Sequence, residues 1–361
     1  MRIALLTEIP APYRVPLFNA LAEQPDVELR VFFLARTDPR RSYRVHDDEH
    51  RFEEETLGGL ELRPGGRWLV LSPRVLRALQ RFRPDAVIVG GWNQPAFLLA
   101  LLWGRARRVP VVSWVESTAR DARSGAPPLE LAKRALIRSF AGFVVPGRAS
   151  ADYLGAFGVP PERIAVAPNA VDPTIFLDRV DRIRDGRPAN ERCSFLYTGR
   201  LEPEKNVGAL VEAVRDLDAE LVVAGTGSEE AALRRLAPPN VRFTGNVDRD
   251  ELPALYAAAD AYVLPSVSEQ WGMTLNEAAL AGLPIVATDA AGAAYELVDD
   301  EVNGFRIPAH DPQALRRALE RLASDPAFRA RAGARSRELG LRLSPEAWAE
   351  AVANFVRTRL S

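Results

Sequence analysis

The chain has few of the residues that most often mark a function. It contains one cysteine, three histidines and two lysines in 361 residues. The single cysteine, Cys193, excludes a disulfide framework and a cysteine-based zinc site, and is typical of a reducing cytoplasm. The longest apolar run, residues 96–103, is too short to span a bilayer. Only residues 3–6 form an apolar run before Thr7 and Glu8, so we expect no signal peptide.

A large net charge is also missing. The formal charge of −1 excludes a strongly polycationic nucleic-acid binder. Residues 1–172 carry 24 basic and 19 acidic side chains, whereas the remainder carries 23 and 29. Arginine clusters in the first part, such as Arg105, Arg107 and Arg108, could attract an anionic lipid surface or a phosphorylated acceptor. The alternative is a solvated, arginine-rich surface. We expect a cytoplasmic protein, with peripheral contact at the inner face of a membrane as a hypothesis.

The length predicts two domains, because a single core rarely grows beyond about 300 residues. Short β-branched runs alternate with helical patterns in both halves, which predicts parallel α/β sheets. We assign residues 1–172 to an N-terminal domain and 193–344 to a C-terminal domain, and interpret 173–192 as a linker. Residues 345–361 are predicted to form a helix that packs back on the N-terminal domain. The polar residues 37–67 are interpreted as a long loop.

The individual strands are predicted from apolar runs bounded by turn residues. They are expected at residues 2–7, 27–34, 86–90, 111–115, 142–145, 164–167, 194–198, 220–224, 241–244, 261–264 and 284–287. Helices in the second half are expected at residues 207–215, 229–236, 251–258 and 273–281. Two such sheets leave a cleft between their strand ends, where ligands of parallel sheets bind.

A turn after the strand 194–198 is the strongest local signal. Gly199 would let the backbone approach a ligand closely. Arg200 adds a planar guanidinium and Lys205 a compact ammonium group just before a helix begins. These elements suit a diphosphate; the alternative is a turn with surface cations. A second turn contains Gly225 and Gly227, which is weak support for a dinucleotide and fits a nucleotide-side turn or a plain turn equally.

A third signal follows the strand 261–264. Gly272 marks the turn into a helix whose first amides, from Met273, Thr274 and Leu275, could hold an anion. Glu269 lies before that helix and Glu277 just inside it, so two carboxylates could accept bonds from a sugar hydroxyl and a ribose diol. The alternatives are an exposed Glu269 and a Glu277 that only favours the helix dipole.

The signals together, in this order, closely resemble the retaining glycosyltransferases of family 4. The matching positions are Gly199-Arg200-Leu201 with Lys205, Pro265-Ser266 with Glu269 and Glu277, residues 281–287, residues 169–172 and residues 303–305. The resemblance implies the GT-B fold, with two Rossmann-like domains facing across a cleft, and a C-terminal domain that binds a nucleotide-sugar donor. It implies that Arg200 and Lys205 contact the diphosphate. It also implies that Glu277 holds the ribose, and that Glu269 with the backbone of residues 272–275 holds the sugar and phosphate.

The N-terminal half departs from the family pattern at two places. Its first turn carries Pro10 and Pro12 in place of a glycine-rich loop, which removes amide donors, so Tyr13 and Arg14 are expected to shape the acceptor side. Glu116 stands where many relatives place a histidine, and is the candidate to accept a hydrogen bond from the acceptor. A satisfied polar residue at a strand end is the alternative.

Metal binding has little support in the sequence. His46 and His50 flank three acids, but no helical period supports that spacing, and we interpret the segment as a solvated loop. Arg200, Lys205 and a helix dipole could instead neutralise a leaving diphosphate. We therefore expect no metal and no cofactor.

These observations predict an enzyme that moves a sugar from a nucleoside diphosphate sugar to an acceptor hydroxyl with retention, in polysaccharide or glycolipid assembly. Arg200, Lys205, Glu269 and Glu116 are the predicted catalytic residues, and a glycan or lipid-linked molecule is the predicted acceptor. Two alternatives remain: a sugar-nucleotide epimerase of the same fold, and a non-catalytic partner subunit that binds the sugar nucleotide.

Overall fold

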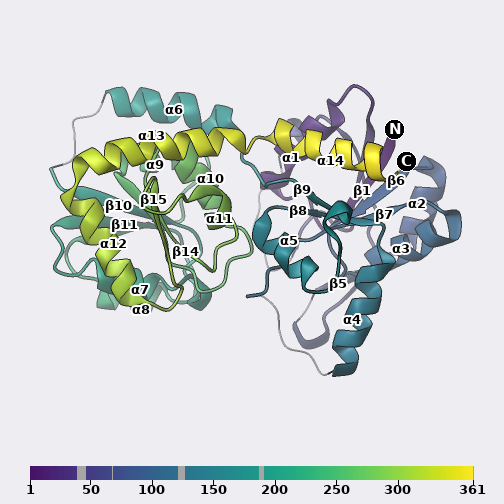
Figure 1. The fold of residues 1–361 in the computed structure, drawn as a ribbon, viewed down its shortest axis with the longest axis horizontal. Coiled ribbons are helices and arrows are strands. Elements are labelled where there is room, and N and C mark those ends of the chain that lie inside the picture. The colour runs from purple at the N-terminus through teal and green to yellow at the C-terminus, as the bar shows by residue number, and fades with distance from the viewer. Residues whose placement is uncertain (39–45, 67, 121–126, 187–190, 361) are drawn as a thin grey trace. The chain divides into compact units, whose positions relative to one another are not determined.

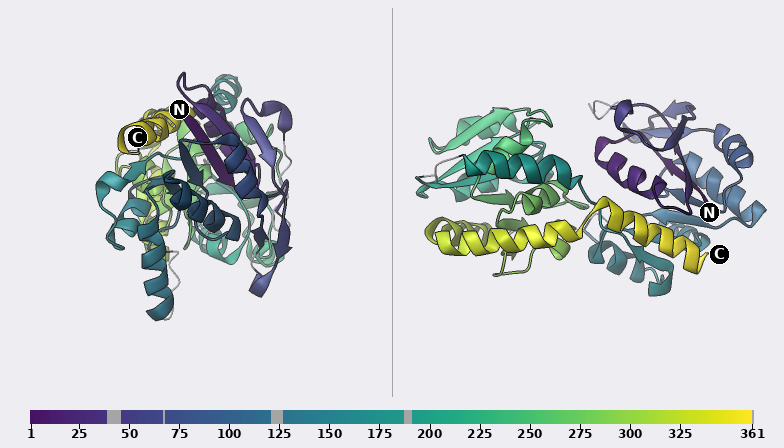
Figure 2. Two further views of the ribbon diagram at one scale, coloured as in Figure 1. Left: turned by 90° about the vertical axis from the view of Figure 1, so that its right-hand side faces the viewer. Right: turned by 90° about the horizontal axis from the view of Figure 1, so that it is seen from above.

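The computed structural model describes residues 1–38, 46–66, 68–120, 127–186 and 191–360. The chain divides into two compact units (Figures 1 and 2). Unit 1 comprises Met1–Ala170 and Pro345–Ser361, and unit 2 comprises Val171–Ser344. Each unit is a parallel sheet covered by helices, which confirms the predicted α/β class.

Unit 1 contains a seven-stranded parallel sheet in the order β3-β2-β1-β6-β7-β8-β9. Its strands are β1 (Arg2–Thr7), β2 (Glu28–Phe33), β3 (Glu53–Thr56), β6 (Ala86–Val89), β7 (Val111–Trp114), β8 (Gly142–Val145) and β9 (Ile164–Val166), and β4 (Leu60–Leu62) pairs antiparallel with β5 (Leu69–Leu71). Its helices are η1 (Pro12–Arg14), α1 (Val15–Ala22), η2 (Asp47–Glu49), η3 (Pro64–Gly66), α2 (Arg74–Phe82), α3 (Pro95–Arg107), α4 (Pro127–Ser139), α5 (Arg148–Gly155), η4 (Pro161–Arg163) and α14 (Pro345–Arg359).

The sheet of unit 1 is buried on both faces because successive side chains of a strand point to opposite sides. Along β1, Ile3 and Leu5 join a core with α1 and α14, whereas Ala4 and Leu6 join a core with α2 and α3. Helix α14 packs on α1 and β9. The fully buried Trp348 of α14 lies 5.1 Å, ring centre to ring centre, from Trp114.

Unit 2 contains a six-stranded parallel sheet in the order β12-β11-β10-β13-β14-β15. The strands are β10 (Cys193–Thr198), β11 (Ala219–Ala224), β12 (Val241–Gly245), β13 (Ala261–Leu264), β14 (Ile285–Thr288) and β15 (Gly304–Ile307). The helices are α6 (Pro173–Asp185), η5 (Pro203–Lys205), α7 (Val207–Ala213), α8 (Glu230–Leu236), α9 (Leu252–Ala258), α10 (Met273–Leu280), α11 (Ala294–Leu297), α12 (Pro312–Ser324) and α13 (Pro326–Arg342). Helices α6, α9, α10 and α13 pack together on one face, and α7, α8 and α12 on the other (Figure 1).

Strand β15 and helices α12 and α13 were not among the predicted elements. Two further segments differ in kind from the sequence-based expectation. The interpretation of residues 37–67 as a loop was wrong for the part that the structure describes, since β3 joins the edge of the sheet and β4 forms half of a hairpin. The acids that suggested a loop pair across strands, as Arg30 with Glu53 does, and charged side chains are common on edge strands. Residues 39–45 and 67 lie outside the described residues.

The segment interpreted as a linker begins with helix α6. Pro173 occupies its first position, and the Asp172 carboxylate caps it by accepting from the Thr174 amide at 2.9 Å. Phe176 and Val180 are buried in the core of unit 2. Aspartate, arginine and proline in this segment therefore cap and solvate a helix, and residues 187–190 lie outside the described residues.

Candidate functional site

The first two turns at the carboxyl edge of the unit 2 sheet are packed directly on each other. A Cβ on Gly225 would lie 1.8 Å from the Gly199 carbonyl oxygen, and one on Gly227 would lie 2.3 Å from the Leu201 carbonyl oxygen. Gly199 and Gly225 also adopt φ angles of +144° and +139°, which disfavour a side chain. Close contact between the turns accounts for these glycines, so their presence alone does not point to a ligand.

The structure brings Lys205 and Glu269 together across 64 positions of sequence. The Lys205 ammonium, at the end of η5, forms an ion pair with the Glu269 carboxylate, and the side chains are only 14% and 18% exposed. Two further bonds join the loops that carry them: Val267 donates its amide to the Glu204 carbonyl at 2.8 Å, and the Asn206 side-chain amide donates to the Pro265 carbonyl at 3.3 Å. A partly buried positive charge with a carboxylate beside it therefore lies next to the start of α7.

Arg200 is not part of this pair. Its side chain is 66% exposed and bonds Glu204, four positions further along the chain, at 3.0 Å. An exposed pair of this kind contributes little free energy and exchanges partners readily. The guanidinium is thus free to move to an anion without a large cost.

Helix α10 begins directly after the loop that carries Glu269. Gly272 precedes it with a φ of +99°, and a Cβ there would lie 3.1 Å from Leu264 Cδ2. The Leu275 amide donates to the Gly272 carbonyl at 2.8 Å, so the amides of Met273 and Thr274 are those left to hold an anion. Trp271 is buried and donates its indole N–H to Asn276 Oδ1 at 2.8 Å, which anchors the turn.

Glu277 lies at the end of a buried hydroxyl network. Its Oε2 accepts a hydrogen bond from Tyr256 at 2.6 Å, and the Tyr256 hydroxyl lies 2.9 Å from Thr198 Oγ1. Thr198 Oγ1 also lies 3.3 Å from the Tyr262 hydroxyl. Burial raises the pKa of Glu277 to about 7, against the lowering effect of the bond from Tyr256. No motif in the sequence marked Tyr256, Tyr262 or Thr198, because they come from three separate elements.

Unit 1 brings its predicted acceptor-side residues together at the carboxyl ends of β1 and β7. Arg14 donates to Thr7 Oγ1 at 2.9 Å and to Glu116 Oε1 at 3.3 Å, and its guanidinium lies over the Trp114 ring at 4.6 Å. Asn169 donates to the same Glu116 oxygen at 3.1 Å. Burial opposes the charged form of Arg14, but the neighbouring Tyr13 and Glu116 outweigh it and raise its pKa. Glu116 is therefore held through one oxygen by two donors.

The histidine segment of unit 1 is more ordered than the solvated loop expected from the sequence. Asp47 lies in η2, and the His50 side chain is 5% exposed, with Nδ1 2.6 Å from Glu54 Oε2. Ligand atoms of Asp47, His50 and Glu54 lie within 4.8 Å of one another. Arg36 forms ion pairs with both Asp47 and Glu54, so a guanidinium supplies the positive charge of this cluster.

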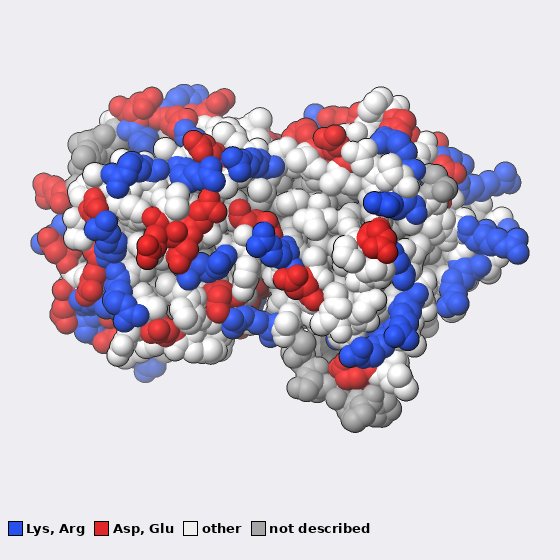
Figure 3. Space-filling model, viewed as in Figure 1, with Lys and Arg blue, Asp and Glu red and all other residues white. Residues whose placement is uncertain are grey.

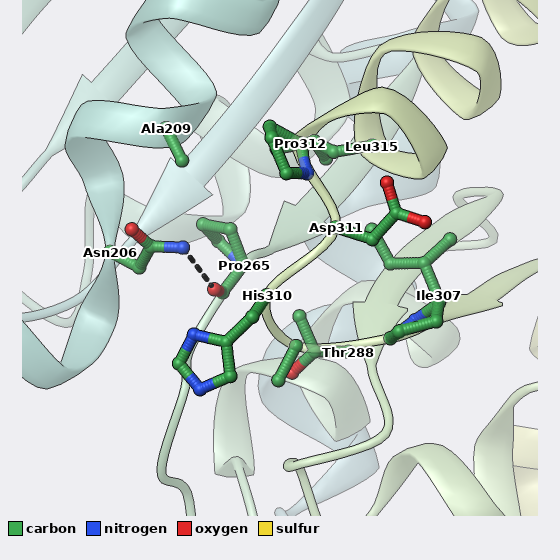
Figure 4. Close-up of a pocket in the computed structure, with 11 residues that line it drawn as sticks. Asn206, Ala209, Pro265, Thr288, Ile307, His310, Asp311, Pro312 and Leu315 are labelled. Carbon is green, nitrogen blue, oxygen red and sulfur yellow. Dashed lines mark hydrogen bonds between the residues drawn. The ribbon is translucent and has the colours of Figure 1, made fainter.

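A cavity of about 220 Å³ opens beside the Lys205–Glu269 loops (Figure 4). It lies where β14 and β15 end and α12 begins, and its lining residues are Asn206, Ala209, Pro265, Thr288, Ile307, Pro308, Ala309, His310, Asp311, Pro312 and Leu315. Asn206 follows Lys205 directly, and its bond to the Pro265 carbonyl crosses one wall (Figure 4). The cavity thus borders both loops that carry the ion pair.

Basic side chains gather on one side of unit 1. Figure 3 shows Lys and Arg along the side that carries α2, α3 and α4, with few acids among them. Arg105, Arg107 and Arg108 are exposed at the end of α3. Leu102 of α3 and Leu131 of α4 are 63% and 70% exposed. Within the described ranges, none of the helices has both the length and the apolar character that crossing a bilayer requires.

Two sequence families match the chain, one in each unit. Residues 11–170 match the glycosyl transferase 4-like domain, and residues 180–339 match glycosyl transferases group 1. The chain is 30% identical over 265 residues to glycogen synthase of Mycobacterium tuberculosis, which covers 68% of this chain and 62% of that protein. It is 32% identical over 221 residues to D-inositol 3-phosphate glycosyltransferase of Xylanimonas cellulosilytica, covering 56% and 52%. The chain thus spans about half to three-fifths of the length of these relatives.

Solved structures share the fold along the whole chain. HepE of Anabaena, in complex with UDP, matches with a TM-score of 0.79 and 20% identity over 99% of this chain and 100% of that chain. Sucrose-phosphate synthase of Thermosynechococcus elongatus matches with a TM-score of 0.71 and 19% identity, covering 99% and 98%. These matches confirm the predicted GT-B fold, with its two Rossmann-like domains.

Proposed function

We propose that this chain, which is related to the GT-B glycosyltransferases in its fold and in the families of both its domains, moves a sugar from a nucleoside diphosphate sugar to an acceptor hydroxyl. The observation that carries the proposal is the Lys205–Glu269 pair beside the amino end of α10. Cation, carboxylate and unpaired amides meet at the edge of a parallel sheet, where such folds bind phosphorylated ligands.

The leaving diphosphate would be stabilised by Lys205 and by the amides of Met273 and Thr274. An ammonium group has three donors, so Lys205 can keep its bond to Glu269 and still donate to a phosphate oxygen. Arg200 would add a second cation once it leaves Glu204. Charge stabilisation of this kind is usually the largest catalytic contribution, and loss of one donor costs about 3 kcal/mol. We propose that these groups replace a divalent metal, and that no cofactor takes part.

The two carboxylates of unit 2 would hold the donor's hydroxyls. Glu269, oriented by Lys205, would accept from the transferred sugar, and Glu277 would accept from the ribose. HepE has been solved with UDP and with UDP-glucose, so UDP-sugars are the first donors to test. The motif resemblance to retaining enzymes supports retention of configuration, and NMR of the product compared with the donor would test it.

The acceptor would bind unit 1 near Glu116. Arg14 and Asn169 bond Oε1, which fixes the carboxylate and leaves Oε2 to accept a hydrogen bond from the acceptor hydroxyl. Tyr13 and Arg14 would shape this side. The arginines near the end of α3, with exposed Leu102 on the same helix, support a lipid-linked acceptor in glycolipid or polysaccharide assembly and peripheral contact with an anionic membrane.

The test is turnover with a panel of nucleoside diphosphate sugars, in the presence and absence of EDTA. Lys205→Met should lower kcat about a hundredfold, because it removes one donor to the leaving group. The chain's other lysine, Lys133, bonds Tyr153 in unit 1 and provides the matched control, since Lys133→Met should keep the wild-type rate. Wild-type turnover in Lys205→Met would overturn the proposed site. Product formed without acceptor would indicate an epimerase instead.

A further inference from the structure

We propose that Tyr256 and Thr198 are positioning residues of the donor site, whose hydroxyls orient the Glu277 carboxylate toward the ribose of a nucleotide sugar. The inference rests on the proposed function and deepens it. Tyr256 lies on α9, Thr198 ends β10 and Glu277 lies on α10, so three elements of unit 2 converge on one carboxylate.

The network is buried and has a definite bonding direction. Tyr256 is fully buried and Thr198 is 4% exposed. Tyr262 donates its single hydroxyl proton to the Thr198 carbonyl at 3.2 Å. An ionised Glu277 can only accept, so the proton of Tyr256 points to Glu277 and the proton of Thr198 can point to the Tyr256 oxygen. Hydroxyls linked in this way polarise one another and strengthen the last bond.

The bond to Tyr256 engages only one oxygen of the carboxylate. Oε2 accepts from Tyr256 at 2.6 Å, and within the described part of the chain Oε1 accepts no hydrogen bond. A carboxylate that is fixed through one oxygen keeps the other aimed in one direction. That second oxygen is the acceptor offered to the ribose diol.

Tyr256 also affects the charge of Glu277. The groups facing this carboxylate are Tyr256 from α9, Tyr262 from β13 and Arg249 from the turn before α9. On the other helices that pack on α9 and α10, α6 contributes Phe176, edge-on to Tyr256 at 5.7 Å, and Arg184, which donates to the Ala281 carbonyl at 2.8 Å. Helix α11 contributes Tyr295, which donates to the Asp289 carbonyl at 3.2 Å. Arg337 of α13 is engaged with Asp181 of α6.

Burial raises the pKa of Glu277 to about 7, and the bond from Tyr256 opposes the rise. Removing that bond should raise the pKa further and leave the carboxyl protonated at neutral pH.

Two matched variants test the proposal. Tyr256→Phe removes the hydroxyl that bonds Glu277. The ring of Tyr262 stacks on that of Tyr256, with 5.8 Å between the ring centres. Tyr262→Phe removes a hydroxyl that bonds Thr198 but does not bond Glu277. Binding of UDP-glucose, or of GDP-mannose if UDP-glucose does not bind, is measured by calorimetry between pH 5.5 and 8.5. These pyrophosphate diesters do not titrate in that range.

The wild-type affinity should fall as the pH drops below about 7. The ionised Glu277 carboxylate accepts hydrogen bonds from ribose hydroxyls at its oxygens, whereas the protonated carboxyl group carries a proton on one oxygen and acts there as a donor. Tyr256→Phe should bind about fivefold to tenfold more weakly at pH 7, with the pH midpoint raised by about one unit. Tyr262→Phe should follow the wild-type profile, and Glu277→Gln should bind weakly without pH dependence.

The outcomes separate the inference from the function on which it rests. If the wild type binds neither nucleotide sugar nor any other of the panel, the proposed function fails. If the wild type binds while Tyr256→Phe and Tyr262→Phe give the same profile, only the inference is wrong. Should Tyr256→Phe not fold, Thr198→Val replaces it, and a wild-type profile for that variant would equally overturn the proposal.

Discussion

The partly buried carboxylate of Glu277 should cost the protein stability at neutral and alkaline pH. Its pKa rises from the ordinary value of 4.5 to about 7 in the folded state, because burial disfavours the charge. The folded state therefore holds this proton more tightly than the unfolded chain. The contribution of Glu277 to stability is fully present below pH 4.5 and is lost as pH rises toward 7. Glu277→Gln, which cannot ionise, should escape that loss.

The size of the effect follows from the two pKa values. Linkage for one group with these values gives a destabilisation of about 1 kcal/mol at pH 5.5 and about 3 kcal/mol at pH 8.5. The advantage of Glu277→Gln over wild type should therefore grow by about 2 kcal/mol between these pH values. For a domain of this size, that difference corresponds to about 4 to 8 °C in Tm.

Thermal unfolding of the wild type and the variant at pH 5.5 and 8.5 provides the measurement. The pH dependence of the difference is diagnostic, because any constant effect of the amide cancels. Glu220, exposed on β11 of the same sheet, provides the control, since Glu220→Gln should change Tm equally at both pH values. If Glu277→Gln also shifts Tm equally at both, the carboxylate titrates normally and the reasoning from burial is refuted.

Two further predictions concern packing and use urea unfolding. Gly225→Ala should lower the free energy of unfolding by about 3 kcal/mol or more, as a severe core mutation does, or prevent unit 2 from folding. The reason is that the new Cβ would lie 1.8 Å from the Gly199 carbonyl oxygen, at a residue whose φ is +139°. Gly208→Ala in α7 is its control and should stabilise by about 0.5–1 kcal/mol, since the new Cβ meets only Leu233 at 3.7 Å; equal midpoints for both variants would contradict the turn contact. Trp348→Ala should destabilise unit 1 by about 3–5 kcal/mol, and an unchanged midpoint would show that α14 does not stabilise it.

Most strands of the two sheets could be predicted from the sequence because they are largely apolar and buried, but β15 was missed. Such strands are mainly apolar runs, and β1, β8 and β13 lie at the predicted bounds. The edge strand β3 could not be predicted in this way. Its sequence, EEET, is polar, and only pairing with β2 makes it a strand.

Helix α6 was missed for a related reason. Its sequence has only a narrow buried stripe, formed by residues such as Phe176 and Val180, among aspartates and arginines. The charged side chains find partners in other elements, as Asp181 does with Arg337 of α13. Composition therefore indicated a linker where tertiary contacts stabilise a helix.

By itself, the sequence determined which residues are candidates for the donor site. The order of the strand-to-helix turns selects Lys205, Glu269 and Glu277, because turns at the carboxyl ends of parallel strands share one edge of the sheet. Only the tertiary structure decided which partners they bond. It pairs Lys205 with Glu269, leaves Arg200 in an exposed pair and attaches Glu277 to a tyrosine. Hydrogen bonds of this kind depend on how separate helices pack, and a local pattern of residues does not contain that information.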